Sequence, residues 1–215
     1  SLLDGRLLLE TDAYAIRWDD QIVRSIGQLG AVLNVNAGRT SSHGVEGSFE
    51  FRPTTAWTLR GGASWNRSEY DAYMFPLIGA IGGNPDLSGK PLQYSPKWTA
   101  NLAAMRTFAI GEWTGYVRGD AQYRDRMAAV QTATATVPAS TRVNLHTGVR
   151  RGPFEVTVWV DNVFDDDAAS AALFLTDPAT VFEFATGQRP GRQLFQPLVS
   201  APVPRTFGVG LRYSF

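Results

Sequence analysis

The final stretch of the chain alternates strictly between large apolar and small or polar side chains. Glycine, arginine or serine stands between successive apolar residues, which are Phe207, Val209, Leu211, Tyr213 and Phe215. Because successive side chains of a strand point to opposite faces, this pattern predicts a strand with one apolar and one polar face. Phe215 is the last residue of the sequence.

The same period of two recurs along the rest of the chain. It predicts further strands at 6–20, 45–52, 57–67, 97–108, 113–124, 142–150 and 154–161. Tyr14, Ile16 and Trp18 mark the first of these, although its alternation is less regular. With the C-terminal strand there are about eight strands, and no convincing amphipathic helix separates them. We therefore expect an all-β fold.

The connections between these strands are of two kinds. Three are tight turns, at 52–55, 109–112 and 151–153, whereas the segments 71–96, 125–140 and 165–204 are long and rich in Gly, Pro and Asp. Short turns on one rim and long loops on the other are typical of an antiparallel, up-and-down barrel of the bacterial outer membrane. An even number of strands puts the C-terminus on the rim of the short turns.

The polar face separates a membrane barrel from a soluble one. Arg118, Asp120 and Arg124 share one face of a predicted strand, and burying such charges in a dry core costs several kcal/mol. The opposite face carries aromatic rings near both strand ends, as in Trp57 and Trp65, which is typical of interfacial girdles. We expect the outer, lipid-facing side to hold Val117, Ala121, Val156, Val158, Val209 and Leu211, and the inner side to hold Arg118, Asp120 and Arg212.

Composition excludes several other classes of protein. The 215 residues carry 20 Lys+Arg and 20 Asp+Glu, so no overall basic field exists to hold nucleic acid. No run of 18 apolar residues is present, which argues against a transmembrane helix. Cysteine is absent, so neither disulfides nor thiolate metal sites are expected.

Motifs that carry chemistry are mostly missing, and we expect no enzyme, no bound metal and no cofactor. Gly62–Asn66 lacks the second glycine of a nucleophile elbow, and Gly89-Lys90 lacks a phosphate-binding loop. His43 and His146 have no partner at ligand spacing. The triplet Asp165–Asp167 could hold a hard cation, but an exposed acidic triplet is usually just solvated.

An ordered series of motifs resembles the barrels of TonB-dependent outer-membrane receptors. The aromatic-x-x-x-Trp strand of that family resembles Tyr14–Ile22, and its asparagine–glycine, glycine–glutamate and proline series resembles the residues that follow. The matching segments are Asn36–Gly38, Gly44–Glu46, Pro53, Leu87–Leu92, Ser95–Lys97, Asp161–Asp165 and Pro204–Gly208. The C-terminal aromatic also resembles the signal by which Gram-negative bacteria recognise outer-membrane barrels, which marks Phe207, Val209, Leu211, Tyr213 and Phe215 as an assembly signal.

This resemblance implies a fold and a place in a larger protein. The family's barrel has about 22 strands around a plug, so about eight strands are its last third and should form an open, curved sheet. Residues 1–215 would be the C-terminal part of the barrel, without the plug domain, TonB box and signal peptide. The sequence begins with Ser1-Leu2-Leu3 and shows no targeting segment at its start, which favours a fragment.

The resemblance also implies a function and partners. It predicts an outer-membrane receptor that takes up a scarce solute, an iron–siderophore complex first, energised through TonB contacting the absent N-terminal region. The expected partners are outer-membrane lipid, the barrel assembly machinery and a small-molecule chelate. Ligand-binding candidates come from the loops and the lumen: Tyr73, Phe75, Tyr94, Tyr116, Arg118, Asp120, Phe174, Arg189 and Arg192. The loop side chains could instead pack loop against loop.

Other interpretations remain open at this point. The leading alternative is a self-contained outer-membrane barrel of about eight strands with a structural or adhesion role, whose interior would be filled by side chains. An outer-membrane hydrolase comes next, against which the missing Ser/His/Asp arrangement counts. A soluble lipocalin-like binder is disfavoured by the charges that would line its cavity.

Overall fold

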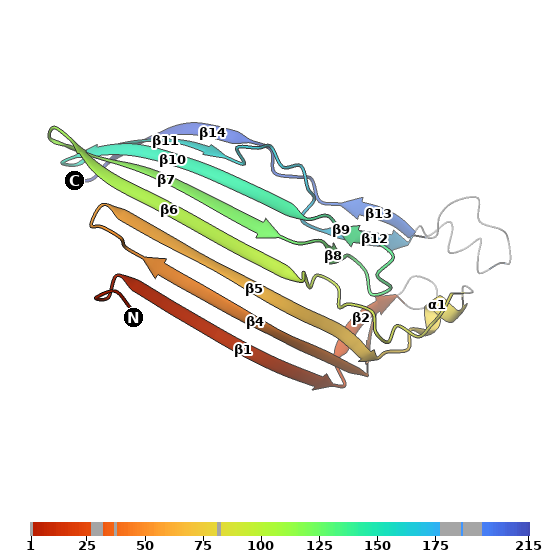
Figure 1. The fold of residues 1–215 in the computed structure, drawn as a ribbon. Helices are drawn as coiled ribbons and strands as arrows, with labels where there is room; N and C mark the ends of the chain where they lie inside the picture. Colours follow the sequence, from red (N-terminus) through yellow and green to blue (C-terminus); the bar gives the residue numbers. More distant parts are fainter. Residues whose placement is uncertain (1, 27–31, 37, 81–82, 177–185, 187–194) are drawn as a thin grey trace.

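The computed structural model describes residues 2–26, 32–36, 38–80, 83–176, 186 and 195–215. Eight strands form one antiparallel sheet, in the order β1-β4-β5-β6-β7-β10-β11-β14 (Figure 1). Their bounds are β1 (Leu7–Asp19), β4 (Arg39–Phe51), β5 (Trp57–Ala72), β6 (Trp98–Ile110), β7 (Trp113–Arg124), β10 (Ser140–Arg151), β11 (Phe154–Asp161) and β14 (Thr206–Tyr213). The eight strands predicted from the alternation are confirmed, in sequential order.

Two strands extend well beyond their predicted ends. β4 begins at Arg39 rather than at residue 45, and β5 continues to Ala72 rather than stopping at 67. In this extension Ser42 pairs with Ser68, and their hydroxyls lie 2.8 Å apart. The ladder continues there although both faces are polar, so the apolar contrast that reveals a strand in sequence is missing.

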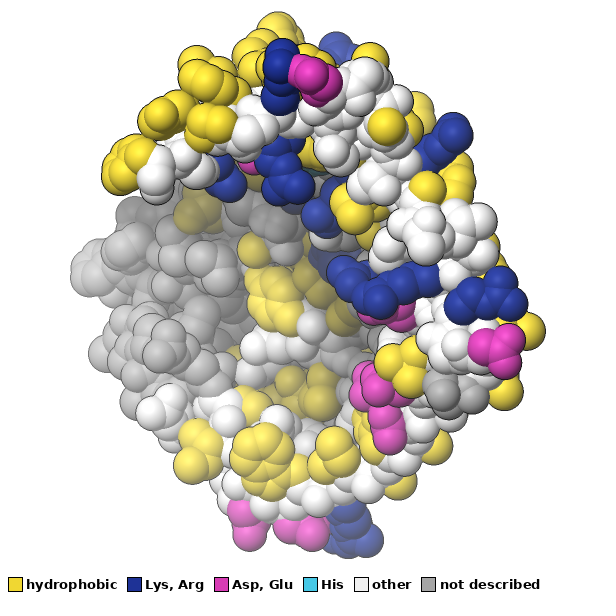
Figure 2. Space-filling view, turned by 90° about the vertical axis from the view of Figure 1, so that its left-hand side faces the viewer, with side chains coloured by type: hydrophobic (Ala, Val, Ile, Leu, Met, Phe, Trp, Pro, Cys, Tyr) yellow, Lys and Arg dark blue, Asp and Glu magenta, His cyan; other side chains and the backbone are white. Residues whose placement is uncertain are grey.

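The sheet is open, as expected. Within the described residues β1 pairs along its length only with β4, and β14 only with β11. Figure 2 views the molecule from the short-turn end and shows an arc around a hollow, with hydrophobic side chains along its outer edge. Both chain termini lie at that end of the sheet (Figure 1).

The long connections gather at the opposite end and carry small elements that the alternation did not predict. These are the hairpin β2 (Ile22–Ile26) and β3 (Val32–Asn36), the helix α1 (Pro76–Ala80), the pair β8 (Met127–Ala128) and β9 (Thr136–Val137), and the pair β12 (Ala172–Thr176) and β13 (Phe195–Val199). Each spans five residues or fewer, too few for a clear period. No helix within the described residues has the length and apolar character needed to cross a membrane.

The buried apolar clusters lie at the long-connection end, among these connections and the end of β5. Tyr70, Tyr73 and Leu87 form one cluster, with Val23 and Val35 of the β2–β3 hairpin packed against it. Met127, Ala129, Val137 and Ala172 form the other. Many large apolar residues of the main sheet are exposed, such as Val209 at 74% and Leu211 at 76%. The long connections therefore have buried clusters, one of them shared with the end of β5, and the sheet presents its apolar face outward.

The strand register confirms the predicted faces. Val117, Thr147, Val158 and Val209 pair in one row across β7, β10, β11 and β14, so they share the outer face. β1 departs from the general pattern. There Tyr14, Ile16 and Trp18 pair with Gly44, Ser42 and Thr40, which places these three large side chains on the inner face.

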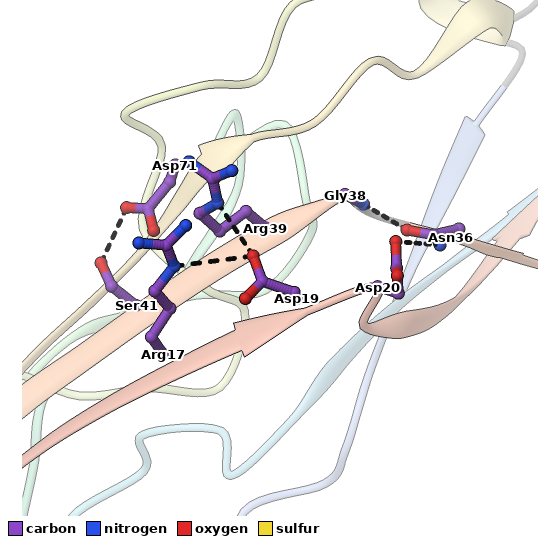
Figure 3. A network of polar contacts seen from close by, with 8 residues as sticks. All are labelled: Arg17, Asp19, Asp20, Asn36, Gly38, Arg39, Ser41 and Asp71. Carbon is purple, nitrogen blue, oxygen red and sulfur yellow. Dashed lines mark hydrogen bonds and ion pairs between the residues drawn. The ribbon is translucent and has the colours of Figure 1, made fainter.

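Polar contacts tie β1, β4 and β5 together at the long-connection end (Figure 3). Arg39 lies 3.0 Å and Arg17 lies 3.5 Å from the carboxylate of Asp19. Asn36 donates to Asp20 and accepts from the N–H of Gly38, whose φ is +74°. A side chain at residue 38 would also collide with the Ala72 carbonyl, so this Asn36–Gly38 motif serves the chain's return into β4.

Candidate functional site: the inner wall of the sheet

We use the name inner wall for the face of the main sheet that carries Tyr116, Arg118 and Asp120. Register places Arg142, Asn144, His146 and Gly148 of β10 on the same face. Two hollows open on this wall, of about 530 Å³ over β6, β7 and β10 and about 350 Å³ over β1, β4, β5 and β6. Figure 2 shows Lys and Arg side chains gathered along the inner side of the arc.

The larger hollow is basic. Its charged side chains are Arg118, Arg124, Arg142 and Asp120, and its neutral polar ones include Asn101 and Ser140. Asp120 lies 3.2 Å from the Nε of Arg118 and accepts a 2.8 Å hydrogen bond from Asn144. The single acid of the hollow is thus already paired, and the hollow keeps an excess of positive charge.

Arg124 and Arg142 are half-buried beside this hollow. The Nη2 of Arg124 donates to the carbonyls of Pro138 and Ala169. Its Nη1 and the Nε of Arg142 are buried, and among the described residues neither has a hydrogen-bond acceptor. Asp166 is close enough to Arg142 to feel its charge, but its carboxylate is bonded elsewhere. Sequence reasoning assigned ligand binding to Arg118 but not to these two arginines.

The smaller hollow is acidic. Glu10, Asp12 and Glu46 line it, together with Ser48, Ser64 and Asn101. Glu50 lies on the same face, one register step nearer the short turns, and is held by Arg60 and Arg52. Charge on the inner wall is therefore divided, with acids over β1 and β4 and arginines over β7 and β10.

The loop aromatics proposed to contact a ligand lie between the long connections. Tyr73 is 2% exposed, donates a 3.2 Å hydrogen bond to Gln131, and stacks on Phe75 with ring centroids 6.0 Å apart. The Tyr94 hydroxyl donates to the carbonyl of Ala172, and its side chain is 38% exposed. These contacts join the segments 71–96, 125–140 and 165–204.

Three proposed ligand contacts cannot be placed as side chains. Phe174 belongs to β12, but its side chain lies outside the described part of the structure. Arg189 and Arg192 lie outside the described residues altogether. The lumen candidates are placed: Tyr116, Arg118 and Asp120 all stand on the inner wall, where Arg118 and Asp120 line the basic hollow.

Two residues of the acidic triplet, Asp165 and Asp166, take part in a structural hub around Asn162. The 2%-exposed Asn162 donates to the carbonyls of Asp166 and Val203 and accepts from the Asp166 N–H. Partial burial alone would raise the pKa of Asp166, but hydrogen bonds from Ala168, Ser140 and Thr141 hold it below the ordinary value. Asp165 accepts from the Arg205 N–H. These carboxylates organise the exit from β11 and are not simply solvated.

No metal centre or catalytic constellation emerges from the described residues. Within them, no group of three or more His, Asp or Glu could hold a metal ion. His146 does have a carboxylate neighbour that its spacing in sequence did not reveal, since its Nε2 lies 3.2 Å from Asp161. That contact pairs two neighbouring strands of the inner wall.

The described geometry is a polar concave wall, an exposed apolar outer face, short turns at one end and folded loops at the other. The sequence profile of the TonB dependent receptor-like β-barrel family matches residues 1–163. The chain belongs to this family. TonB-dependent receptors are outer-membrane proteins and transporters, not enzymes, so the expected location and the expected absence of catalysis agree with the family.

Solved receptor structures share the fold of this TonB-dependent receptor barrel. The ferric yersiniabactin uptake receptor FyuA from Yersinia pestis matches 98% of the chain with a TM-score of 0.73 at 15% identity. The ferric preacinetobactin receptor BauA from Acinetobacter baumannii matches 98% with a TM-score of 0.63 at 18% identity. The copper transporter OprC also matches 98%, with a TM-score of 0.60 at 15% identity.

The chain spans less than a third of these proteins: 28% of FyuA, 28% of BauA and 29% of OprC. No curated protein sequence matches it significantly. At such identities the likeness establishes the shared fold, whereas the transported solute has to be argued from the chain itself.

Proposed function

We propose that this chain is the C-terminal part of the barrel of a receptor that imports a metal chelate across the outer membrane, an iron–siderophore complex first. The observation that carries the proposal is the polar inner wall, which ends in a hollow of about 530 Å³ toward the long connections. Pockets of this size suit a drug-sized solute. In a barrel of this family the long loops face the outside, so the hollow would meet solute arriving from there.

The solved structures with the same fold support a chelate as the solute. FyuA and BauA are described as receptors for ferric yersiniabactin and ferric preacinetobactin. OprC is described as a copper transporter, so copper is the second candidate metal. Ligand contacts on this chain would come from Tyr116, Arg118 and Asp120 of the wall and from Tyr94 at its rim.

The rest of the protein would supply the plug and the TonB contact. An open sheet with a charged inner wall needs both a closing partner and polar neighbours, because unpaired strand edges and bare charges are costly to leave uncovered. Further barrel strands and an N-terminal plug would meet these needs. The apolar outer face would contact outer-membrane lipid, and the C-terminal strand would be recognised by the barrel assembly machinery.

The alternative of a self-contained small barrel fits less well. Such a barrel must close by pairing its first strand with its last. Here Leu7–Asp19 and Thr206–Tyr213 stand at opposite edges of the sheet. The division of charge across the inner wall also differs from an interior filled by packed side chains.

The test is uptake by cells that carry the full-length gene. Radioactive iron supplied as a panel of siderophore complexes should accumulate in expressing cells and stop when TonB is deleted. Radioactive copper, supplied in parallel, separates the second candidate from the first. Accumulation that does not depend on TonB, or none with either metal, would contradict the proposal.

A further inference from the structure

We propose that Arg118, Arg124 and Arg142 form a subsite that binds a carboxylate group of the imported solute. This inference rests on the proposed function and narrows it to chelates with negative charge. The supporting observation is the set of residues that line the basic hollow. Two of them, Arg124 and Arg142, were not among the ligand-binding candidates from the sequence.

The charge balance of the hollow calls for an anion. Three arginines line it, and its one lining acid, Asp120, is already held by Arg118 and Asn144. Asp166 lies near Arg142, but its carboxylate is bonded by Ser140 and Thr141. A guanidinium fork matches a carboxylate with two parallel N–H···O bonds, and such charged hydrogen bonds are about twice as strong as neutral ones. Arginines lining one hollow therefore favour a carboxylate over a neutral amide or hydroxyl.

Partial burial strengthens this preference. Arg124 and Arg142 are half-buried, and each has a buried nitrogen without an acceptor in the described part of the chain. A partly desolvated cation is screened less by water, so its attraction to an anion is larger than at an open surface.

The position of the hollow indicates that its occupant is a solute rather than another segment of the protein. Arg124 is the last residue of β7 and Ser140 is the first residue of β10, both at the long-connection end. Ser170, which also lines the hollow, belongs to a long connection. The subsite therefore lies at the end of the wall from which the long connections extend. The acidic hollow is a separate site, formed by β1, β4, β5 and β6.

Titration calorimetry on the purified full-length receptor tests the subsite without any need for TonB or for the natural ligand. The probe is citrate, and its trimethyl ester serves as a neutral copy of the same skeleton. Citrate should bind, and the ester should bind at least about tenfold more weakly. Arg142→Gln and Arg124→Gln should each weaken citrate binding about tenfold or more, and Arg142→Lys should restore part of it.

Arg60→Gln is the matched control, because Arg60 stands on the same wall but already pairs with Glu50. It should leave citrate binding unchanged. Equal weakening in all variants, equal binding of citrate and ester, or no citrate binding by the unaltered receptor would overturn the subsite. Unchanged citrate binding in Arg124→Gln and Arg142→Gln would also overturn it. A lowered melting temperature of these variants would then indicate that the two arginines contact the plug. Uptake of an uncharged chelate through TonB would leave the proposed function standing in each case.

Discussion

The ring of Tyr116 on β7 covers Gly148 on β10, directly across the strand pair. A Cβ atom at residue 148 would lie 2.7 Å from the Cε1 atom of Tyr116, closer than any side chain allows. The same cross-strand arrangement recurs in four more pairs on the two faces: Tyr14–Gly44, Phe49–Gly61, Phe108–Gly115 and Trp159–Gly208. An aromatic ring laid over a glycine shields the exposed backbone and fixes the register.

Gly148→Ala should therefore destabilise the barrel. The added methyl must push the Tyr116 ring out of place, and overpacking of this kind costs about 1–3 kcal/mol. The urea midpoint of the full-length protein refolded in detergent is the measurement. Gly47→Ala is the control, because a Cβ there would lie an ordinary 3.5 Å from its nearest neighbours.

The effect should depend on the ring. In a Tyr116→Ala background, Gly148→Ala should cost clearly less, because the ring that it displaces is gone. An equal cost with and without the ring would show that the strain comes from the backbone.

Val158→Arg should be far more harmful than Thr157→Arg. Val158 is 45% exposed on the outer face, whereas Thr157 is its neighbour on the inner face. An arginine at a lipid-facing position near the bilayer midplane costs about 2–4 kcal/mol, and one facing an aqueous lumen costs much less. Unfolding of both variants of the full-length protein from lipid bilayers gives the comparison, and equal tolerance would reverse the assignment of faces.

Acid should loosen the exit from β11 by protonating Asp166. Its folded pKa lies below the ordinary value of about 3.9, so its carboxylate stabilises the fold above that pH. This contribution is lost as the pH falls through the folded pKa. The amides of Thr141 and Ala168 donate to this carboxylate. Their protection against hydrogen exchange, relative to the intrinsic exchange rate at each pH, should fall over that range.

Asp166→Asn should speed exchange at these two amides already at neutral pH and remove the acid dependence. The exposed neighbour offers the control, since Asp167→Asn should leave both amides protected. If the two amides stay protected in Asp166→Asn, the structure at the exit from β11 depends on Asn162 and not on the Asp166 carboxylate.

Deleting Phe215 should impair assembly more than stability. Phe215 is fully exposed and lies beyond the end of β14, so its loss should cost at most about 1–3 kcal/mol. An unfolded barrel must nevertheless be recognised before any sheet exists. The full-length protein without Phe215 should be scarce in the outer membrane yet keep its urea midpoint after refolding. Normal abundance would leave Phe215 without a signalling role.

The strands and their faces could be read from the sequence because each is a local property. Alternation assigned Val158 to one side and Thr157 to the other, and the register agrees. Alternation was less informative where apolar and polar side chains did not alternate clearly. The polar end of β4, the short pairs in the loops and the inward-facing Ile16 and Trp18 of β1 all lack a clean two-residue period.

The candidate site could be read only in part. Arg118 and Asp120 were recognised from their polar face, but nothing in the sequence marks Arg124 and Arg142 as neighbours of one hollow. They belong to different strands, and only the register of β7 against β10 brings them together. Tyr73 and Tyr94 show the same limit, because their contacts are with Gln131 and Ala172, far along the chain.

By itself, the sequence determined the eight strands of the main sheet, the inner and outer faces of most of them, the end at which the short turns lie, and the family. These follow from side-chain direction, which repeats every two residues, and from turn chemistry, which involves only adjacent residues. The tertiary structure confirmed the open sheet, and it alone decided that the long connections have buried apolar clusters and that arginines of β7 and β10 share a hollow. The physical reason is that curvature and strand register are set by hydrogen bonds between segments far apart in the chain, and no local pattern specifies them.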